Sequence, residues 1–194
     1  LYQVIEQAKV FPFQNYFDKG LAQKLYPFDI LSGAVLTLSL QKYGQNERSL
    51  FSFIDSNDDL AIGSFEQLGK PYYSIPTIYD YLLNNYHSYI LSKYNTHYAQ
   101  WASIRRAIEK LDGLFTTADD QSSAEDLVKL IGLLSIFSSA TAKLEPSFYV
   151  TYARYALGIQ NADEIIATLE KRKIIRYVKH GVKYILAEGT DLDI

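Results

Sequence analysis

Apolar residues recur at helical spacing along most of the chain. One stripe consists of residues separated by three or four positions: Tyr98, Trp101, Ile104, Ile108 and Leu111. This spacing places them on one face of a helix that begins after Asn95 or Thr96 and ends before Gly113. Two further segments, Phe28–Lys42 and Ala124–Ser139, are apolar on nearly all sides. Helices with that pattern are buried, so the sequence predicts a core built from long helices.

Shorter helices are predicted where Pro, Gly or Asn can begin or end one. Their expected positions, in chain order, are Leu1–Ala8, Glu47–Ile54, Ser64–Leu68, Thr77–Leu91, Pro146–Gly158 and Ala162–Lys173. The segment Thr116–Ser123 is polar and acidic, and we therefore expect it to form a loop rather than part of a helix.

The last part of the chain changes from helical spacing to strand spacing. Residues 174–178 and 182–187 alternate like strands, and His180-Gly181 between them suits a hairpin turn. Helices followed by such a hairpin are typical of a winged helix. We therefore predict a mainly α fold: a helical bundle over residues 1–113, followed by a winged-helix domain with a small β-hairpin over residues 114–194.

Composition places the chain among ordinary globular proteins, with 48% hydrophobic and 21% charged residues in 194 positions. The formal net charge of −3 means that binding to nucleic acid or to an acidic membrane would need a local basic patch. The absence of Cys excludes disulfides, a thiolate nucleophile and cysteine-ligated metals. The chain begins at Leu1 and contains no Met, so we expect a fragment of a longer protein, or a sequence from which residues are missing.

No segment has the pattern of a membrane span or of a secretion signal. The longest apolar stretch, Ile30–Leu40, is much shorter than the roughly 20 residues that cross a bilayer. Leu1–Val10 lacks the basic start and the apolar run of a signal peptide. We expect a cytoplasmic protein without a membrane partner.

Catalytic and metal-binding patterns are absent from the sequence. The three histidines, at positions 87, 97 and 180, lack the spacing of a helical zinc pair, and no spacing groups the acidic residues Glu66, Asp80 and Glu109. Carboxylates at residues 188–193 could ligate Mg²⁺ or Ca²⁺, but they lack calcium-loop spacing and are interpreted as a solvated linker. We predict no catalytic residue, no metal site and no cofactor site within this chain.

The predicted hairpin and the residues just before it are strongly basic. Between residues 171 and 183 there is no acidic residue, whereas the segment contains Lys171, Arg172, Lys173, Arg176, Lys179 and Lys183. In a DNA-binding winged helix such side chains would contact phosphates. Asp163 and Glu164, however, open the presumed recognition helix and would be repelled by phosphates. DNA contact and a solvated or intramolecular wing therefore remain alternative interpretations.

A second unusual feature is the predicted start of the helix after Gly44. Asn46 is a suitable cap and Glu47 suits the first turn, but a cation at Arg48 opposes the helix dipole. A guanidinium in such a position can be held by a carboxylate or by a phosphate. The interpretations are a surface salt bridge, or a sensor that contacts a nucleotide bound by a neighbouring domain.

Two stretches of the chain, Leu25-Tyr26-Pro27-Phe28 and Gly44 to Phe53, resemble part of the large prokaryotic P-loop ATPases of the AAA/STAND type. In that family the matching stretch is the helical part just after the nucleotide-binding core. The helix around Tyr79-Asp80-Tyr81, the Trp101 helix, the Leu127–Phe137 helix and residues 188–194 are similar to the next segments of those ATPases.

The resemblance implies a helical lid and winged helix that come after a nucleotide-binding core lying outside this chain. The fragment would be non-catalytic and would relay nucleotide state to effector regions, while ATP and Mg²⁺ would be bound by the parent protein. Asn46, Glu47 and Arg48 would sense nucleotide, or Arg48 would approach an adjacent subunit of a homo-oligomer. The expected partner is the remainder of the parent chain.

Two functions of other classes remain alternatives. The first is a winged-helix regulator that binds DNA through its basic wing. The second is a protein-interaction module, because tyrosine is frequent and its ring and hydroxyl suit interfaces. The tyrosines expected to form that surface are Tyr72, Tyr73, Tyr86 and Tyr89.

Overall fold

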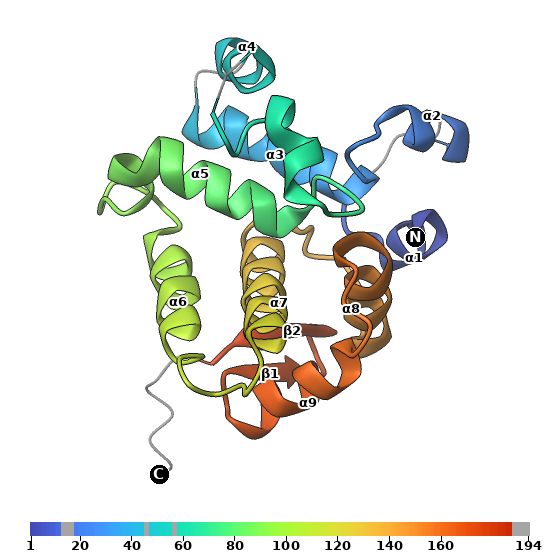
Figure 1. Cartoon of the computed structure of the whole chain (residues 1–194), viewed down its shortest axis with the longest axis vertical. Helices are drawn as coiled ribbons and strands as arrows, with labels where there is room; N and C mark the ends of the chain where they lie inside the picture. Colours follow the sequence, from blue (N-terminus) through green and yellow to red (C-terminus); the bar gives the residue numbers. More distant parts are fainter. Residues whose placement is uncertain (13–17, 45–46, 56–57, 188–194) are drawn as a thin grey trace.

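A computed structural model describes residues 1–12, 18–44, 47–55 and 58–187. In this part of the chain the fold is mainly helical, with one small antiparallel sheet of two strands near the carboxyl end (Figure 1). The predicted mainly α class and the predicted hairpin are therefore confirmed. No described helix combines the length and the apolar character that a membrane crossing requires.

The helices alternate with short connections along the chain. In chain order they are α1 (Tyr2–Ala8), α2 (Lys19–Lys24), α3 (Ile30–Tyr43), α4 (Glu47–Asp55), the 3₁₀ helix η1 (Ile62–Leu68), α5 (Ile75–Ile90), α6 (Tyr98–Glu109), α7 (Ala118–Phe137), α8 (Pro146–Tyr152), the π-helical turn η2 (Ala153–Leu157) and α9 (Ala162–Lys171). The strands are β1 (Ile175–Val178) and β2 (Lys183–Leu186), with Arg176 opposite Ile185.

The longest helix, α7, is the centre of the packing. It contacts α5, α6, α9 and β2, and α3 packs against both α5 and α7. In Figure 1, α7 lies in the middle, with α3, α4 and α5 beyond one of its ends and α9 and the sheet beyond the other. Buried apolar residues from Ile5 to Leu186 form one cluster. This cluster includes residues on both sides of position 113. The division into a helical domain and a winged-helix domain at that position stays a prediction.

Helix α7 begins six positions before the predicted start at Ala124, so the expected loop at Thr116–Ser123 is wrong. The Thr117 hydroxyl caps the helix by accepting a hydrogen bond from the Asp120 amide at 3.1 Å. Asp119 and Asp120 then occupy the first turn, where carboxylates interact favourably with the positive end of the helix dipole. The acidic composition that suggested a loop is the composition of a capped helix start.

The start of α3 also differs from the predicted segment, because the helix begins at Ile30 rather than at Phe28 and Asp29 is its cap. Its Oδ1 accepts hydrogen bonds from the amides of Leu31 at 2.8 Å and Ser32 at 3.0 Å. The short helix α2 was not predicted. It is capped in the same way by Asp18, which accepts from the Leu21 amide at 2.8 Å.

Backbone hydrogen bonds extend the hairpin beyond its strands and attach its turn to the rest of the fold. Beyond the strands, the Ala187 amide donates to the Ile174 carbonyl at 2.9 Å. At the turn, the Val182 carbonyl accepts from the Leu144 amide at 2.7 Å. The segment between α7 and α8 therefore lies against the turn of the hairpin.

Candidate functional site

The Arg48 side chain is exposed on α4, as a contact with another domain would require. Asn46 lies outside the described residues, and the same holds for the side chain of Glu47. The structure confirms that a helix begins at this point in the chain.

Helix α4 has one buried face and one apolar face that is open to solvent. Phe53 is buried and packs with its ring centroid 4.8 Å from that of Tyr81. On the outer side, exposure reaches 42% for Leu50, 69% for Phe51 and 55% for Ile54. Phe51 lies three positions after Arg48, so the two side chains are neighbours on the helix surface. A guanidinium therefore borders an exposed apolar stripe.

The apolar stripe of α4 continues into a groove beside α3. The groove has a volume of about 510 Å³ and is lined mainly by apolar side chains, among them Phe11, Leu25, Leu36, Leu38 and Leu50. Leu50 belongs to both the groove and the outer face of α4. We use the name α4 face for Arg48, Leu50, Phe51 and Ile54.

The basic residues predicted to contact DNA are largely exposed. Lys171, Arg172, Lys173, Arg176 and Lys179 are exposed and Lys183 is half-buried. Asp163 and Glu164 are exposed at the start of α9, and Asp163 lies 3.6 Å from the Arg154 guanidinium. Acidic groups thus occupy the beginning of α9, and basic groups extend from its end into the hairpin. The charge conflict at the presumed recognition helix is present in the folded chain.

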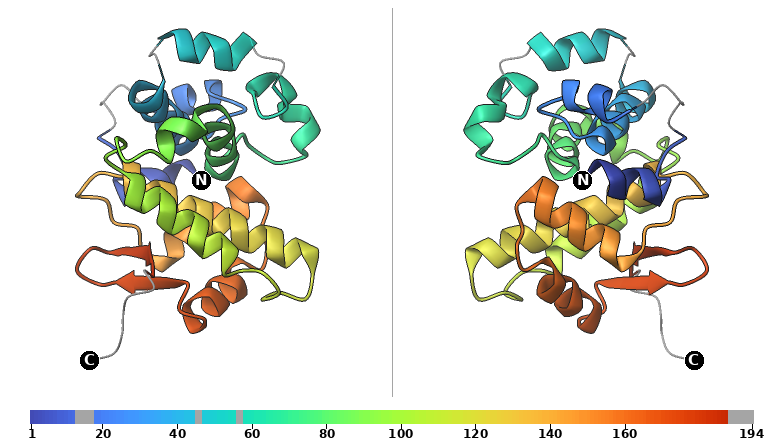
Figure 2. Two further views of the ribbon diagram at one scale, coloured as in Figure 1. Left: turned by 90° about the vertical axis from the view of Figure 1, so that its left-hand side faces the viewer. Right: turned by 90° about the vertical axis from the view of Figure 1, so that its right-hand side faces the viewer.

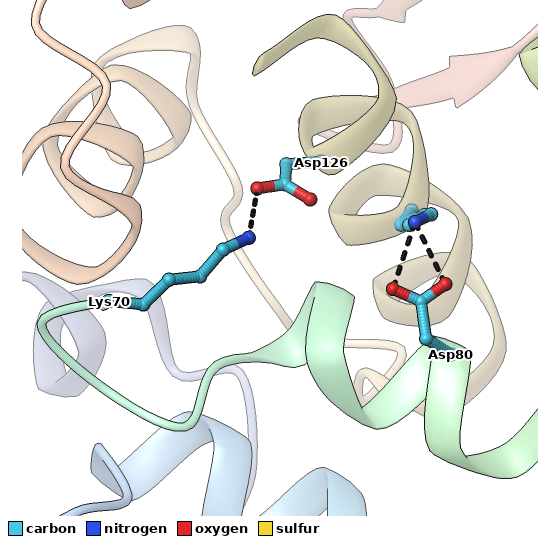
Figure 3. A network of polar contacts seen from close by, with 4 residues as sticks. Lys70, Asp80 and Asp126 are labelled. Carbon is cyan, nitrogen blue, oxygen red and sulfur yellow. Dashed lines mark hydrogen bonds and ion pairs between the residues drawn. The ribbon is translucent and has the colours of Figure 1, made fainter. Parts of the chain in front are cut away.

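A network of charged side chains joins α7 to the preceding half of the chain (Figure 3). Lys70 lies 2.6 Å from Asp126, and Lys129 lies 2.8 Å and 3.0 Å from the two carboxylate oxygens of Asp80. Burial raises the pKa of the Asp80 carboxyl, and the Lys129 ammonium opposes that shift. These pairs tie α5 and the turn before it to α7.

Aromatic rings continue this network into the core. The Lys129 ammonium lies 5.6 Å from the centroid of the Tyr79 ring, which stacks on Trp101 at 5.3 Å. The Trp101 indole then donates a hydrogen bond to the Tyr43 hydroxyl at 3.0 Å. Sequence reasoning missed the network, although Asp126 and Lys129 were visible as two charges within a segment expected to be largely buried.

A buried carboxylate provides a further link between the two halves. Asp29 accepts a hydrogen bond from the Tyr152 hydroxyl at 2.7 Å, in addition to the two amides at the start of α3. Burial raises the pKa of the Asp29 carboxyl, although these hydrogen bonds act in the opposite direction. The bond connects the N-cap of α3 to the end of α8. It holds two helices together and offers no free catalytic acid.

The raised pKa of Asp29 predicts a pH dependence of stability. A carboxyl whose pKa is higher in the folded state contributes stability that is present below its unfolded value of 3.8 and lost as the pH rises through the folded value. We expect urea denaturation to show this loss in the wild type and not in Asp29→Asn, whose amide oxygen can still cap α3.

Asp58 serves as the control for this prediction. Hydrogen bonds from the Leu60 amide and Asn85 lower the pKa of Asp58, so its contribution is present above 3.8 and lost as the pH falls. Asp58→Asn should therefore remove a pH dependence of the opposite sign. An Asp29→Asn protein whose stability showed the same pH curve as the wild type would contradict the assignment.

The other residues considered for catalysis lie on separate elements. Asp80 is held by Lys129, whereas Glu66 is exposed on η1 and Glu109 is exposed on α6. His87 is in α5, His97 precedes α6, and His180 is exposed in the hairpin turn. Within the described residues, no group of His, Cys, Asp and Glu is arranged to hold a metal ion.

A second pocket, of about 450 Å³, lies beside α1, α2 and the start of α3. Its lining includes Tyr2, Lys19, Tyr26, Asp29 and Tyr72. Asp29 is the buried acid of this lining, and its oxygens are occupied by the hydrogen bonds described above. The pocket therefore presents aromatic rings, aliphatic side chains, Gln23 and one exposed lysine.

Comparisons of the chain with protein-family models, with curated proteins and with solved structures find no match. The α4 face, the basic hairpin and the links between the two halves are therefore the features on which a functional proposal rests.

Proposed function

We propose that the chain is a non-catalytic helical and winged-helix body that docks on the nucleotide-binding core of a larger P-loop ATPase and relays nucleotide state to effector regions. The observation that carries this proposal is the α4 face. It combines an exposed aromatic ring, exposed aliphatic side chains and an exposed guanidinium on one short helix. Aromatic residues and arginine are the types enriched where proteins dock.

Arg48 supports the nucleotide part of the proposal. A cation in the first turn of a helix is disfavoured by the helix dipole, and a nearby phosphate would offset that cost. The planar guanidinium can also donate two parallel hydrogen bonds to a phosphate. The partner of the α4 face would therefore carry both an apolar surface and an anionic group, as a nucleotide-loaded core does.

The carboxyl-terminal half supports the winged-helix part of the proposal. Helices α7, α8 and α9 precede the hairpin, which is the order that a winged helix requires. The hydrogen bond from the Leu144 amide to the Val182 carbonyl places the connection between α7 and α8 beside the hairpin turn. We expect the winged-helix domain to begin directly after Gly113, which lies between α6 and α7.

The links between the two halves provide the physical route for the proposed relay. A displacement of α3 would act on α8 through Asp29 and Tyr152. A displacement of α5 would act on α7 through Asp80 and Lys129. Coupling between distant sites requires such contiguous packed or hydrogen-bonded connections, or two states that both sites bias.

The tyrosine surface considered as an alternative receives less support. Tyr73 is buried, Tyr72 and Tyr86 are half-buried, and Tyr89 is exposed. Tyr73 packs against Phe28, with ring centroids 5.2 Å apart, and therefore belongs to the core. A docking surface on this chain is better represented by the α4 face.

The test uses the full-length parent protein with Arg48→Ala. We expect its steady-state rate of ATP hydrolysis to fall by about tenfold or more, because an arginine that contacts the transferred phosphate stabilises developing charge. Arg48→Lys should restore part of the rate only, since lysine lacks the planar fork. The 194-residue chain alone should not hydrolyse ATP.

Arg105→Ala is the matched control, because Arg105 is exposed on α6 and its loss changes the net charge equally. Its rate should equal that of the wild type. A parent protein without ATPase activity, or an Arg48→Ala protein with an unchanged rate, would reject the nucleotide-sensing proposal.

A further inference from the structure

Three segments that are far apart in the sequence meet beside the hairpin turn. The segment between α7 and α8 donates from the Lys143 amide to the Ala8 carbonyl and from the Ser139 amide to the Val10 carbonyl, both at 2.8 Å. One residue later, the Leu144 amide donates to the Val182 carbonyl. Figure 2 shows the hairpin projecting on the same side of the molecule as this connection and the end of α1.

This meeting point gathers lysines that the sequence places in three separate regions. Lys9, Lys143 and Lys179 are exposed, and Lys183 is half-buried. The Lys183 side chain runs along the turn, since a Cβ built on Gly181 would lie 3.7 Å from the Lys183 Cγ. Two of these backbone hydrogen bonds join residues that are themselves these lysines or lie next to them in the chain, since Ala8 precedes Lys9 and Val182 precedes Lys183. We use the name tip patch for Lys9, Lys143, Lys179 and Lys183.

The positive charge of the tip patch is not neutralised within the described part of the chain, where none of its four ammonium groups forms an ion pair. Within the described residues, two acidic residues lie within three positions of a patch lysine. Glu145 is exposed two positions after Lys143, and Glu6 accepts a hydrogen bond from Tyr2 in α1. His180 is exposed in the turn itself. The patch is therefore basic although the whole chain is acidic.

We propose that the tip patch binds the phosphate backbone of a nucleic acid duplex and that α9 does not read bases. The lysine ammonium is a compact point charge that can contact a backbone phosphate. Such a contact carries no information about the base sequence. The exposed acids at the start of α9 would be repelled by the duplex. The contact is therefore made by the hairpin turn, the connection before α8 and the end of α1.

A membrane surface is a weaker match to the same charges. Peripheral membrane binding needs exposed apolar side chains beside the lysines. The large exposed hydrophobic residues of the described chain lie elsewhere: Tyr26, Leu38, Leu50, Phe51, Ile54, Tyr89, Tyr94, Tyr98 and Tyr155. The proposal does not depend on the function proposed for the α4 face, because it uses a different surface and a different partner.

The test is fluorescence anisotropy of the 194-residue chain with labelled duplexes of mixed sequence, titrated at several salt concentrations. We expect binding at low salt that is equal for unrelated sequences. Each phosphate contact contributes a slope near −0.9 in a plot of log affinity against log salt, so four contacts predict a slope of about −3 to −4. Parallel titrations with DNA and RNA duplexes distinguish the two sources of the backbone.

Two double variants locate the surface. Lys9→Gln with Lys143→Gln should lower affinity at low salt by about tenfold and reduce the slope by about 2, and Lys179→Gln with Lys183→Gln should do the same. The control is Lys42→Gln with Lys93→Gln, which changes the charge equally on exposed lysines of α3 and of the turn after α5. All variants alter exposed or half-buried side chains, and circular dichroism verifies their fold.

Several outcomes would overturn the proposal. The first is that the chain does not bind a duplex at low salt. The second is that the double variant of Lys9 and Lys143 binds with the same affinity as the wild type. The third is that the control variant loses as much affinity as the tip-patch variants. Tighter binding to polyglutamate or to anionic lipid vesicles than to the duplex would assign the patch to an acidic protein or to a membrane instead.

Discussion

Replacement of Trp101 by alanine is expected to lower the free energy of unfolding by about 3–5 kcal/mol. Trp101 is fully buried in α6, stacks on Tyr79, and lies edge-on to Tyr43 with ring centroids 5.9 Å apart. Its removal leaves a large cavity and takes away the donor to the Tyr43 hydroxyl. Urea denaturation monitored by circular dichroism measures the change, because Trp101 is the single tryptophan and its fluorescence is lost.

Two further variants separate the contributions of Trp101. Trp101→Phe keeps an aromatic ring but loses the hydrogen bond, and should cost less than the alanine variant. Tyr98→Ala removes a ring from the exposed side of the same helix and should change stability by about 0.5 kcal/mol or less. Equal costs for Trp101→Ala and Tyr98→Ala would show that the stacked rings do not form the centre of this part of the core.

Replacement of Gly132 by alanine is the second large effect that we expect. A Cβ at Gly132 in α7 would lie 2.3 Å from Cγ1 and 2.6 Å from Cδ1 of Ile104 in α6. Either the Ile104 side chain or the two helices would have to move, at a cost of about 1–3 kcal/mol in the free energy of unfolding. This cost runs against intrinsic propensity, because alanine in a helix is more favourable than glycine by about 1 kcal/mol.

The chain contains a matched control for this prediction. A Cβ at Gly33 in α3 would meet Leu25 and Phe28 at 3.8 Å and 3.9 Å, which are ordinary contacts. Gly33→Ala should therefore be neutral or stabilising by about 0.5–1 kcal/mol. The double variant of Gly132→Ala with Ile104→Ala should cost less than the sum of the two single changes. Additive costs would indicate that α6 and α7 are not in close contact at this point.

Both predictions concern the part of the core that links the two proposed functional surfaces. Tyr79 is neighboured by Asp80, which pairs with Lys129 on α7. Helix α7 also contacts α9 and β2, which lead into the basic hairpin. A variant that loosens α6 from α7 is therefore expected to have two effects. It should lower the free energy of unfolding, and it should weaken any coupling between the α4 face and the rest of the chain.

Most helices could be located from the sequence because their patterns are local. The stripe in α6 and the nearly all-apolar segments in α3 and α7 reflect the spacing of residues a few positions apart. The hairpin could also be located from a local pattern, because two segments of alternating residues flank His180-Gly181. Errors occur where a single side chain decides a boundary, as Thr117 does for α7 and Asp29 does for α3. The short helix α2 has too few apolar residues to produce a periodic signal.

The candidate surfaces were only partly visible in the sequence. Arg48 and the basic run of residues 171–183 stand out because charge at a helix start, or a run of one sign, is a local property. Lys9 and Lys143 belong to the tip patch only because distant backbone groups pair. The ion pairs of Lys70 and Lys129 likewise depend on how α5 and the turn before it lie against α7.

The sequence by itself determined that this protein is mainly helical, that a basic hairpin comes after its last helix, and that Arg48 stands at the start of an amphipathic helix. These properties depend on residues within one or two turns of one another. Only the tertiary structure decided which apolar face stays open on α4, which lysines gather at the tip patch, and which carboxylates are buried and paired. Those outcomes depend on packing between elements many positions apart, and no local pattern contains that information.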